Sequence, residues 1–378
     1  MTFVYFLLSI SLIYPLGLII FKDFKLSPII RSFLSILIIS LVVSFTSRLV
    51  PSFTREIIFL ILFISYIYIC LNFKYFKSAI PVLNLKSFSR CILFILIFGL
   101  ILFDINPYVY RFEAHDIHIF GPTIEIFNSD YNGNIRNPLS YPLELSSYHT
   151  LPGIFIGVSS FLNPSLTLLD LIIGKYLILI IFLGGIFYEI SSPLKYKLIY
   201  LASLLLIIYF FKETIYYELS ISSYLYAITL SIIGAVSLKD DLHQDEHISI
   251  LFCLLLSLMA MKIPIFYVLI PSLIYLFLKF FKILFSATTF IFSALIFLNF
   301  LIIYLIPTSS KIGEVVSYSI MNPFDLDSLR SLAGLWFVES RTLDILTIDF
   351  GMGQENFLFG VSFNSLASLI LKLLIIII

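Results

Sequence analysis

Charged residues are scarce in this chain, since Lys, Arg, Asp and Glu together make up only 12% of its 378 residues. Soluble domains carry about 25%. Hydrophobic residues reach 60% and the mean hydropathy is +1.07, which excludes an ordinary soluble domain. Basic and acidic residues are equal in number, so the chain also lacks the basic surface that recruits nucleic acid, and we expect no nucleic-acid partner.

Cysteine, linkers and repeats are also sparse or missing. Cys70, Cys91 and Cys253 all fall inside apolar runs without CxxC spacing, which predicts packing roles rather than disulfides or metal ligands. No internal repeat or Gly/Ser linker divides the chain, so we expect one integral domain. The first apolar run, 3–21, has no basic residue before it and no small-residue cleavage site after it, which favours a first membrane span over a cleaved signal peptide.

Long apolar runs are what the chain does have. A bilayer core is crossed by about 20 apolar residues in a helix, because no water is present to satisfy backbone groups. The runs predict an all-α fold, a polytopic transmembrane helical bundle of about 10–11 spans with a large outer loop carrying surface helices. The candidate spans are 3–21, 28–45, 57–73, 91–103, 171–188, 198–211, 219–238, 248–261, 264–278 and 283–306.

Two polar stretches divide the predicted domain. N-terminal helices in 1–103 precede an acidic loop with interfacial helices in 104–170, and further helices in 171–306 precede an outer loop and terminal hydrophobic segment in 307–378. The last apolar piece, 366–378, is too short to cross comfortably. It predicts an interfacial helix or a chain that continues further.

Lys and Arg are concentrated in short loops, and such loops face the cytoplasm. The loops assigned to the cytoplasm are 22–31, 74–90, 189–197, 239–247 and 279–282. The loop 239–247 is acidic, but acids weigh little in this rule. This assignment places both polar stretches on the non-cytoplasmic side of a multi-pass protein, which we expect in the plasma (inner) membrane. It also predicts that 150–163 lies along the outer surface as a re-entrant or interfacial helix, because a further span there would reverse every later loop.

Glu113 and Asp116 stand one helical turn apart in the acidic stretch. A carboxylate at a low-dielectric boundary can act as a general base for an acceptor hydroxyl. The alternative is an ordinary solvated acidic loop. A divalent metal site built from Asp116 with His115, His118 and His149 also stays open, although histidines in a wet loop are common.

Other polar landmarks are candidate substrate contacts. Lys262 interrupts a long apolar run next to Pro264, which predicts two spans joined by a very tight turn; a lysine there suits the phosphate of a lipid carrier or simply marks the turn. Tyr141 precedes Pro142 in a segment typical of a structured loop. Glu218 is either a substrate contact or a helix-end residue.

In this order, Asp116, Tyr141-Pro142 and Lys262-Ile263-Pro264 resemble the landmarks of the GT-C superfamily of polytopic glycosyltransferases, which includes protein mannosyltransferases and lipid A aminoarabinose transferases. The similar layout covers about residues 104–282. The chain departs from it at Ser222 and Ser223, where the family often has a further Asp, and in having four spans before the acidic loop.

The resemblance implies that a lipid-linked sugar donor, carried on polyprenyl phosphate, hands its sugar to an acceptor of the cell-envelope glycan type on the outer face. Asp116 would be the base, Glu113 its substitute and Lys262 a contact to the donor phosphate, with Tyr141, His149 and Glu218 also binding substrate. Membrane lipids are the other expected partners, and no cofactor is implied beyond the metal left open above.

Two alternatives remain. A polysaccharide polymerase or ligase would use lipid-linked sugars with arginines in an outer loop, for which Arg330 and Arg341 are available. A transporter or lipid flippase would show polar residues within several spans, or helices broken at the membrane midplane. Charges are almost absent from the predicted spans, which favours surface chemistry.

Overall fold

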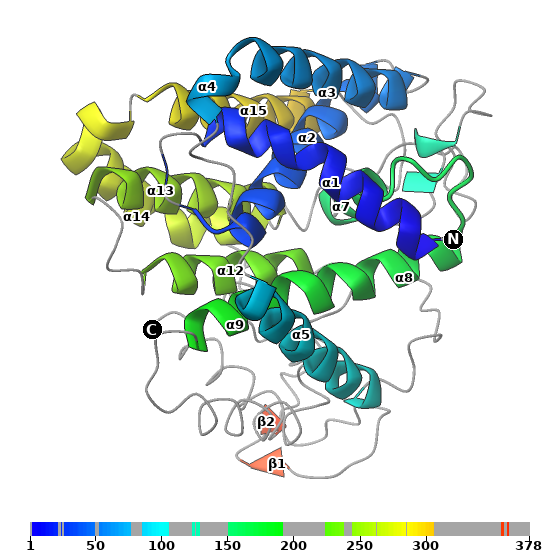
Figure 1. The fold of residues 1–378 in the computed structure, drawn as a ribbon. Coiled ribbons are helices and arrows are strands. Elements are labelled where there is room, and N and C mark those ends of the chain that lie inside the picture. Colours follow the sequence, from blue (N-terminus) through cyan, green and yellow to red (C-terminus); the bar gives the residue numbers. More distant parts are fainter. Residues whose placement is uncertain are drawn as a thin grey trace, which may run out of the picture.

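The computed structural model describes residues 2–21, 24, 26–49, 53–76, 85–105, 123–124, 126–128, 150–191, 224–237, 244–261, 263–284, 286–305, 357–358 and 361–362. In these ranges the protein is a bundle of α-helices (Figure 1). The described β-structure is a short antiparallel pair of β1 (Phe357–Leu358) and β2 (Val361–Ser362). The predicted helical class is confirmed for this part of the chain.

The helices follow the apolar runs closely. They are α1 (Thr2–Ile20), α2 (Pro28–Leu49), α3 (Thr54–Leu71), α4 (Phe73–Phe76), α5 (Leu85–Ile105), α7 (Thr150–Ser159), α8 (Leu168–Ile178), the π-helix η2 (Leu179–Leu183), α9 (Gly184–Ser191), α12 (Tyr224–Ser237), α13 (Gln244–Met261), α14 (Ile263–Leu284) and α15 (Ala287–Leu305). Each predicted span coincides with a described helix, except 198–211, which lies outside the described residues.

Four helical segments are long and apolar enough to cross a membrane: Thr2–Ile20, Pro28–Ser47, Thr54–Leu71 and Leu168–Ile190. Their apolar side chains and internally bonded backbones suit a solvent that offers no hydrogen bonds. The structure thus supports a membrane protein, and the larger predicted number of spans stays a prediction.

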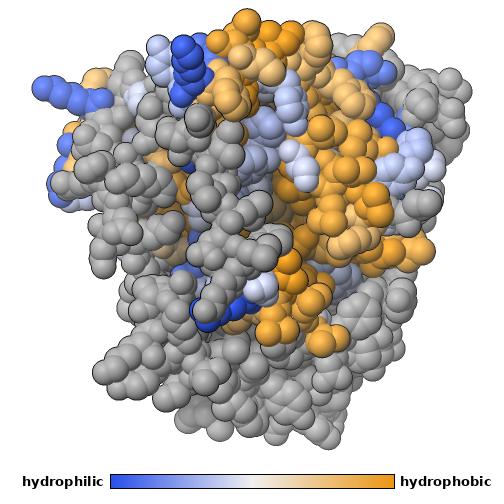
Figure 2. All heavy atoms as spheres, in the orientation of Figure 1, coloured by the Kyte–Doolittle hydropathy of each residue, from blue (hydrophilic) through white to orange (hydrophobic). Residues whose placement is uncertain are grey.

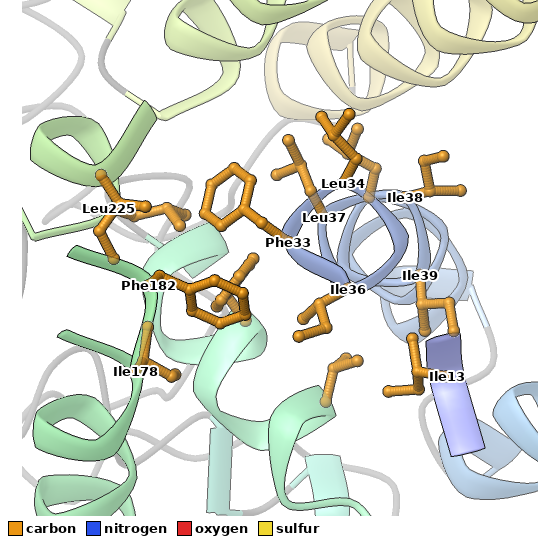
Figure 3. Close-up of a cluster of buried hydrophobic side chains, with 14 of the residues drawn as sticks. Ile13, Phe33, Leu34, Ile36, Leu37, Ile38, Ile39, Ile178, Phe182 and Leu225 are labelled. Atoms are coloured by element: carbon orange, nitrogen blue, oxygen red, sulfur yellow. The ribbon is translucent and has the colours of Figure 1, made fainter. Parts of the chain in front are cut away.

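Helix α2 is the centre of the bundle, surrounded by α1, α7 and α15 (Figure 3). Its Phe33 ring packs against Phe155 of α7 and Phe182 of η2, with ring centroids 5.3 and 5.5 Å apart. Leu34, Ile36 and their neighbours along α2 are almost completely buried. The buried hydroxyls of Ser35 and Ser40 donate to carbonyl oxygens one turn earlier, so α2 can be covered by protein on nearly every side in this central position.

Glycines allow the helices to approach one another closely. A Cβ atom on Gly17 of α1 would lie 2.2 Å from Ser35 Oγ of α2, and one on Gly185 of α9 would lie 2.4 Å from Ile29 Cδ1. Gly174 of α8 meets Ile156 of α7 in the same way, at 2.8 Å. Because lipid tails are as apolar as leucine, helices in membranes associate through such close packing rather than through a hydrophobic drive.

Large apolar side chains cover the outer faces of α1, α3, α5, α14 and α15. Leu60 and Phe63 of α3 and Leu93 of α5 are more than half exposed. On the face shown in Figure 2, hydrophobic residues form a broad area over α1 and α3. Exposed apolar patches of this extent indicate contact with lipid or protein rather than water.

Replacing Gly157 of α7 by Ala should destabilise the bundle, because the new Cβ would lie 2.5 Å from the buried Phe127 ring and 2.9 Å from Thr123 Cγ2. Overpacking of this kind costs about 1–3 kcal/mol. Thermal unfolding followed by circular dichroism in detergent should show a lower Tm. Gly234→Ala in α12 is the matched control, since nothing lies within 4 Å of its Cβ position, and its Tm should not fall. Equal Tm values for the two variants would contradict this packing.

Candidate functional site

The side chains that the sequence nominates for chemistry lie outside the described residues. They are Glu113, Asp116, Tyr141, His149, Glu218 and Lys262. The histidines of the metal hypothesis, His115 and His118, lie outside them too. Within the described ranges, no three His, Cys, Asp or Glu side chains are grouped as a metal site. Roles for all of these residues therefore stay predictions, and the structure contributes the helix ends that flank them.

One end of the bundle, here called the Thr2 end, is closed by polar contacts between distant segments. Thr2 Oγ1 of α1 donates to Asp170 Oδ1 of α8 at 2.5 Å. Asp170 Oδ2 accepts from Thr167 N and Oγ1 at 2.9 and 2.6 Å, and Thr167 caps the start of α8. This capping box ties the first residue of α1 to the first turn of α8.

Arg55, near the start of α3, holds two more segments at the Thr2 end. Its Nε donates to the Phe127 carbonyl oxygen at 2.5 Å, and its Nη2 donates to the Asn163 carbonyl oxygen at 2.6 Å. Asn128 pairs with the Leu166 backbone in both directions, at 3.0 and 2.9 Å. The planar guanidinium is suited to bridging two acceptors at once. These contacts are directed at backbone oxygens, so their role is to position the segments.

The opposite end of the bundle, here called the Lys282 end, is formed by the helix ends that lie away from Thr2. Thr288 Oγ1, at the start of α15, donates to the Ile20 carbonyl oxygen at the end of α1. Phe94 in the middle of α5 packs against Tyr188 near the end of α9, with ring centroids 5.8 Å apart, so the first half of α5 extends toward this end. Helix ends that the basic loops assign to one side of the membrane thus lie together. Which end faces the cytoplasm remains a prediction.

Lys262 was predicted to mark a very tight turn between two helices. Helix α13 ends at Met261 and α14 begins at Ile263, and the two pack side by side. Ile248 and Phe252 of α13 contact the same apolar cluster as Leu273 of α14. Since α14 ends at the Lys282 end, its start lies toward the Thr2 end. Helix α5 lies beside the helix that contains η2, with Gly99 next to Ile180, and the two run in opposite directions. Helix α5 therefore also ends toward the Thr2 end.

Helix α7 differs from the surface position expected for 150–163. From Leu151 to Phe161 the side chains are buried, and α7 contacts α1, α2, α8 and α13. Burial by protein on all sides fits the re-entrant alternative and not a helix lying along the membrane surface. Its ten residues span about 15 Å, roughly half of a bilayer core.

The start of α7 is the deep end of this short helix. The last turn of α7 lies near Gly174 of α8. The Phe155 ring, earlier in α7, lies near Phe182, which is about two turns closer to the Lys282 end than Gly174. The Pro152 carbonyl oxygen accepts from the buried Tyr224 hydroxyl of α12 at 2.7 Å. A tyrosine hydroxyl that is buried away from water needs an acceptor, and this carbonyl supplies it.

Beside α7, the helix from Leu168 to Ser191 is interrupted by η2, followed by Gly184 and Gly185. Pi-helical turns inside α-helices are rare and are frequent at functional sites. The sequence analysis did not predict η2, the Arg55 contacts or the capping box. The Thr167-x-x-Asp170 spacing before an apolar run could have predicted the capping box. Apart from the paired glycines, the sequence gives no local signal for η2.

Replacing Arg55 by Ala should lower stability by about 1.5–3 kcal/mol for each charged hydrogen bond lost, less what water recovers at this half-buried site. Arg55→Lys should retain part of the stability, because one ammonium cannot bridge both carbonyls in a fixed plane. Exposed Lys74→Gln in α4, away from these contacts, is the control and should stay near wild type. Urea unfolding in micelles measures all three, and an Ala variant as stable as the control would rule out the bridging role.

Comparison with known proteins gives no match for this chain: no family model fits it, and neither a curated protein nor a solved structure is significantly similar to it.

Proposed function

We propose that this chain is a membrane glycosyltransferase that moves a sugar from a polyprenyl-phosphate donor to an acceptor on the non-cytoplasmic face. The proposal is supported chiefly by the helix ends at the Thr2 end. Helix α5 stops at Ile105, just before the acidic stretch, and the α13–α14 junction at Lys262 is directed to the same end. Under this proposal, an acid and a lysine that are far apart in sequence follow helix ends that are directed to the same end of the bundle.

The chemistry follows from these residue types. A carboxylate of Asp116, with Glu113 as its substitute, would take the proton from the acceptor hydroxyl as that oxygen attacks the anomeric carbon. The bond between that carbon and the donor phosphate breaks with inversion, and the polyprenyl phosphate leaves. Lys262 would stabilise the charge on this phosphate. Tyr141, His149 and Glu218 would contact the sugar or acceptor.

Asp116→Asn should lower turnover by about 10²–10⁴-fold, the usual contribution of a general base. In cells, unconsumed polyprenyl-linked sugar should accumulate, as measured by mass spectrometry of the lipid extract. Asp130→Asn removes an acid from the same polar stretch outside the motif and serves as the control. Normal turnover in Asp116→Asn, with Glu113→Gln equally active, would rule out this acid pair as the base.

The proposal also requires the acidic stretch to face away from the cytoplasm. In a background without Cys70, Cys91 and Cys253, Ser129→Cys should react with a membrane-impermeant maleimide added to intact cells or spheroplasts. Ser78→Cys, in a basic loop, should react only after the membrane is opened. The reverse pattern would overturn both the orientation and the site.

A second candidate, transport or flipping of a lipid-linked substrate, is favoured by one observation. Helix α7 is a buried half-length helix whose start lies deep in the bundle, and η2 interrupts the neighbouring helix at the same depth. Broken helices at mid-depth are typical of secondary transporters. Reconstituted vesicles separate the two functions. Movement of labelled polyprenyl-linked sugar between leaflets without any transfer to an acceptor would support the second candidate.

A further inference from the structure

The last turns of α14 form an exposed edge that mixes aromatic, aliphatic and basic side chains. We call Tyr275, Leu278, Lys279, Phe281 and Lys282 the α14 edge. Leu278 is 73% exposed and Tyr275 58% exposed, and both lysines are exposed. A helix on the outside of a membrane bundle that combines apolar and basic groups at its end matches the boundary between lipid tails and head groups.

The edge is held in position from behind. Phe280 lies on the inward side and packs with Leu276 against the cluster formed by Ile248, Phe252 and Leu284. The backbone leaves helical geometry at Phe280, where φ is −121° and ψ is 26°. This kink lies between Lys279 and Lys282, so the two lysines stand on helical turns with different axis directions. The packed Phe280 ring holds this part of the helix in place.

The lysine ammonium groups are arranged for an anion at this edge. Lys279 Nζ donates a hydrogen bond to the Tyr275 hydroxyl oxygen at 2.9 Å and lies 5.3 Å from the centre of the Tyr275 ring. Neither Lys279 nor Lys282 forms an ion pair with an acidic residue among the described side chains. Tyr275 can donate its hydroxyl proton to a phosphate that the lysines hold. Two cations and one hydroxyl donor therefore lie on the last turns of one helix, next to an apolar face.

Charge is distributed unequally between the two ends of the bundle. Among the described residues, the exposed cations at the Lys282 end are Lys74, Arg90, Lys279 and Lys282, beside the partly buried acid Glu189, while Arg55 and the acids Glu56 and Asp170 lie at the Thr2 end. Exposed lysines and arginines close to a membrane surface attract an anionic leaflet.

We propose that the α14 edge is a binding site for anionic phospholipid. Its lysines and the Tyr275 hydroxyl hold the phosphate, and Leu278 and Phe281 contact the acyl chains. An anionic leaflet is favoured over a protein partner because the exposed apolar face continues along α14 and α15, where Ile274 and Phe290 also face outward. The inference is independent of the proposed sugar transfer, which concerns the other end of the bundle.

The test uses the full chain purified in uncharged detergent, titrated with fluorescent phosphatidylglycerol and, separately, with phosphatidylcholine carrying the same chains. Wild type should bind phosphatidylglycerol more tightly, and high salt should weaken that binding. Lys279→Gln with Lys282→Gln should lose roughly thirtyfold in apparent affinity for it, since each lysine at an anionic surface contributes about 1 kcal/mol. Binding of phosphatidylcholine should not change.

Lys279→Arg with Lys282→Arg keeps both charges and should retain the preference. Lys175→Gln, which removes a cation in α8 away from the edge, should also leave it intact. Equal wild-type affinity for the two lipids would overturn the proposal, as would a Gln double variant that binds phosphatidylglycerol like wild type. If the Gln variant does not fold, the wild-type lipid comparison and its salt dependence decide the question.

Discussion

Backbone hydrogen bonding without water is the constraint on which the rest of this structure depends. A chain with 60% hydrophobic residues and 12% charged residues places most of its length in surroundings that cannot satisfy amide groups. Helices satisfy their own amides, so the described chain is almost entirely helical. What remains to be satisfied are helix ends and irregular segments. Those are the places where Thr2, Arg55, Asn128 and Asp170 form their hydrogen bonds.

Close packing then takes the place of a water-driven core. Gly17, Gly157, Gly174 and Gly185 let neighbouring elements approach to distances at which a Cβ would overlap another atom. Around α2 this yields tightly packed aromatic contacts, such as that of Phe33 with Phe155 and Phe182. Such contacts hold α7 inside the bundle although it is too short to cross a membrane. The buried Tyr224 hydroxyl completes this arrangement by pairing with the Pro152 carbonyl.

The two ends of the bundle differ in a way that fits a division of roles. The Thr2 end is tied together by directed hydrogen bonds between segments, as a site that must hold reacting groups in register requires. The Lys282 end presents exposed lysines and aromatic rings, which suit a diffuse anionic surface. The proposed function would use both features, because lipid bound at the Lys282 end would keep the proposed site at the Thr2 end at a fixed depth in the membrane.

The sequence by itself determined the helical class and the approximate position of each described helix. Hydrophobic length and charge are local properties, so span 28–45 matches Pro28–Leu49 and the break at Lys262 matches the α13–α14 junction. The candidate residues Glu113, Asp116, Tyr141, His149, Glu218 and Lys262 rest on sequence alone.

Only the tertiary structure decided where α7 lies, that η2 interrupts its neighbour, and that Arg55 bridges Phe127 and Asn163. A short apolar segment has the same composition on a membrane surface and inside a bundle. Its position depends on whether partners such as Gly174 and Tyr224 offer space and a hydrogen bond. Those partners are distant in sequence, so no local pattern encodes them.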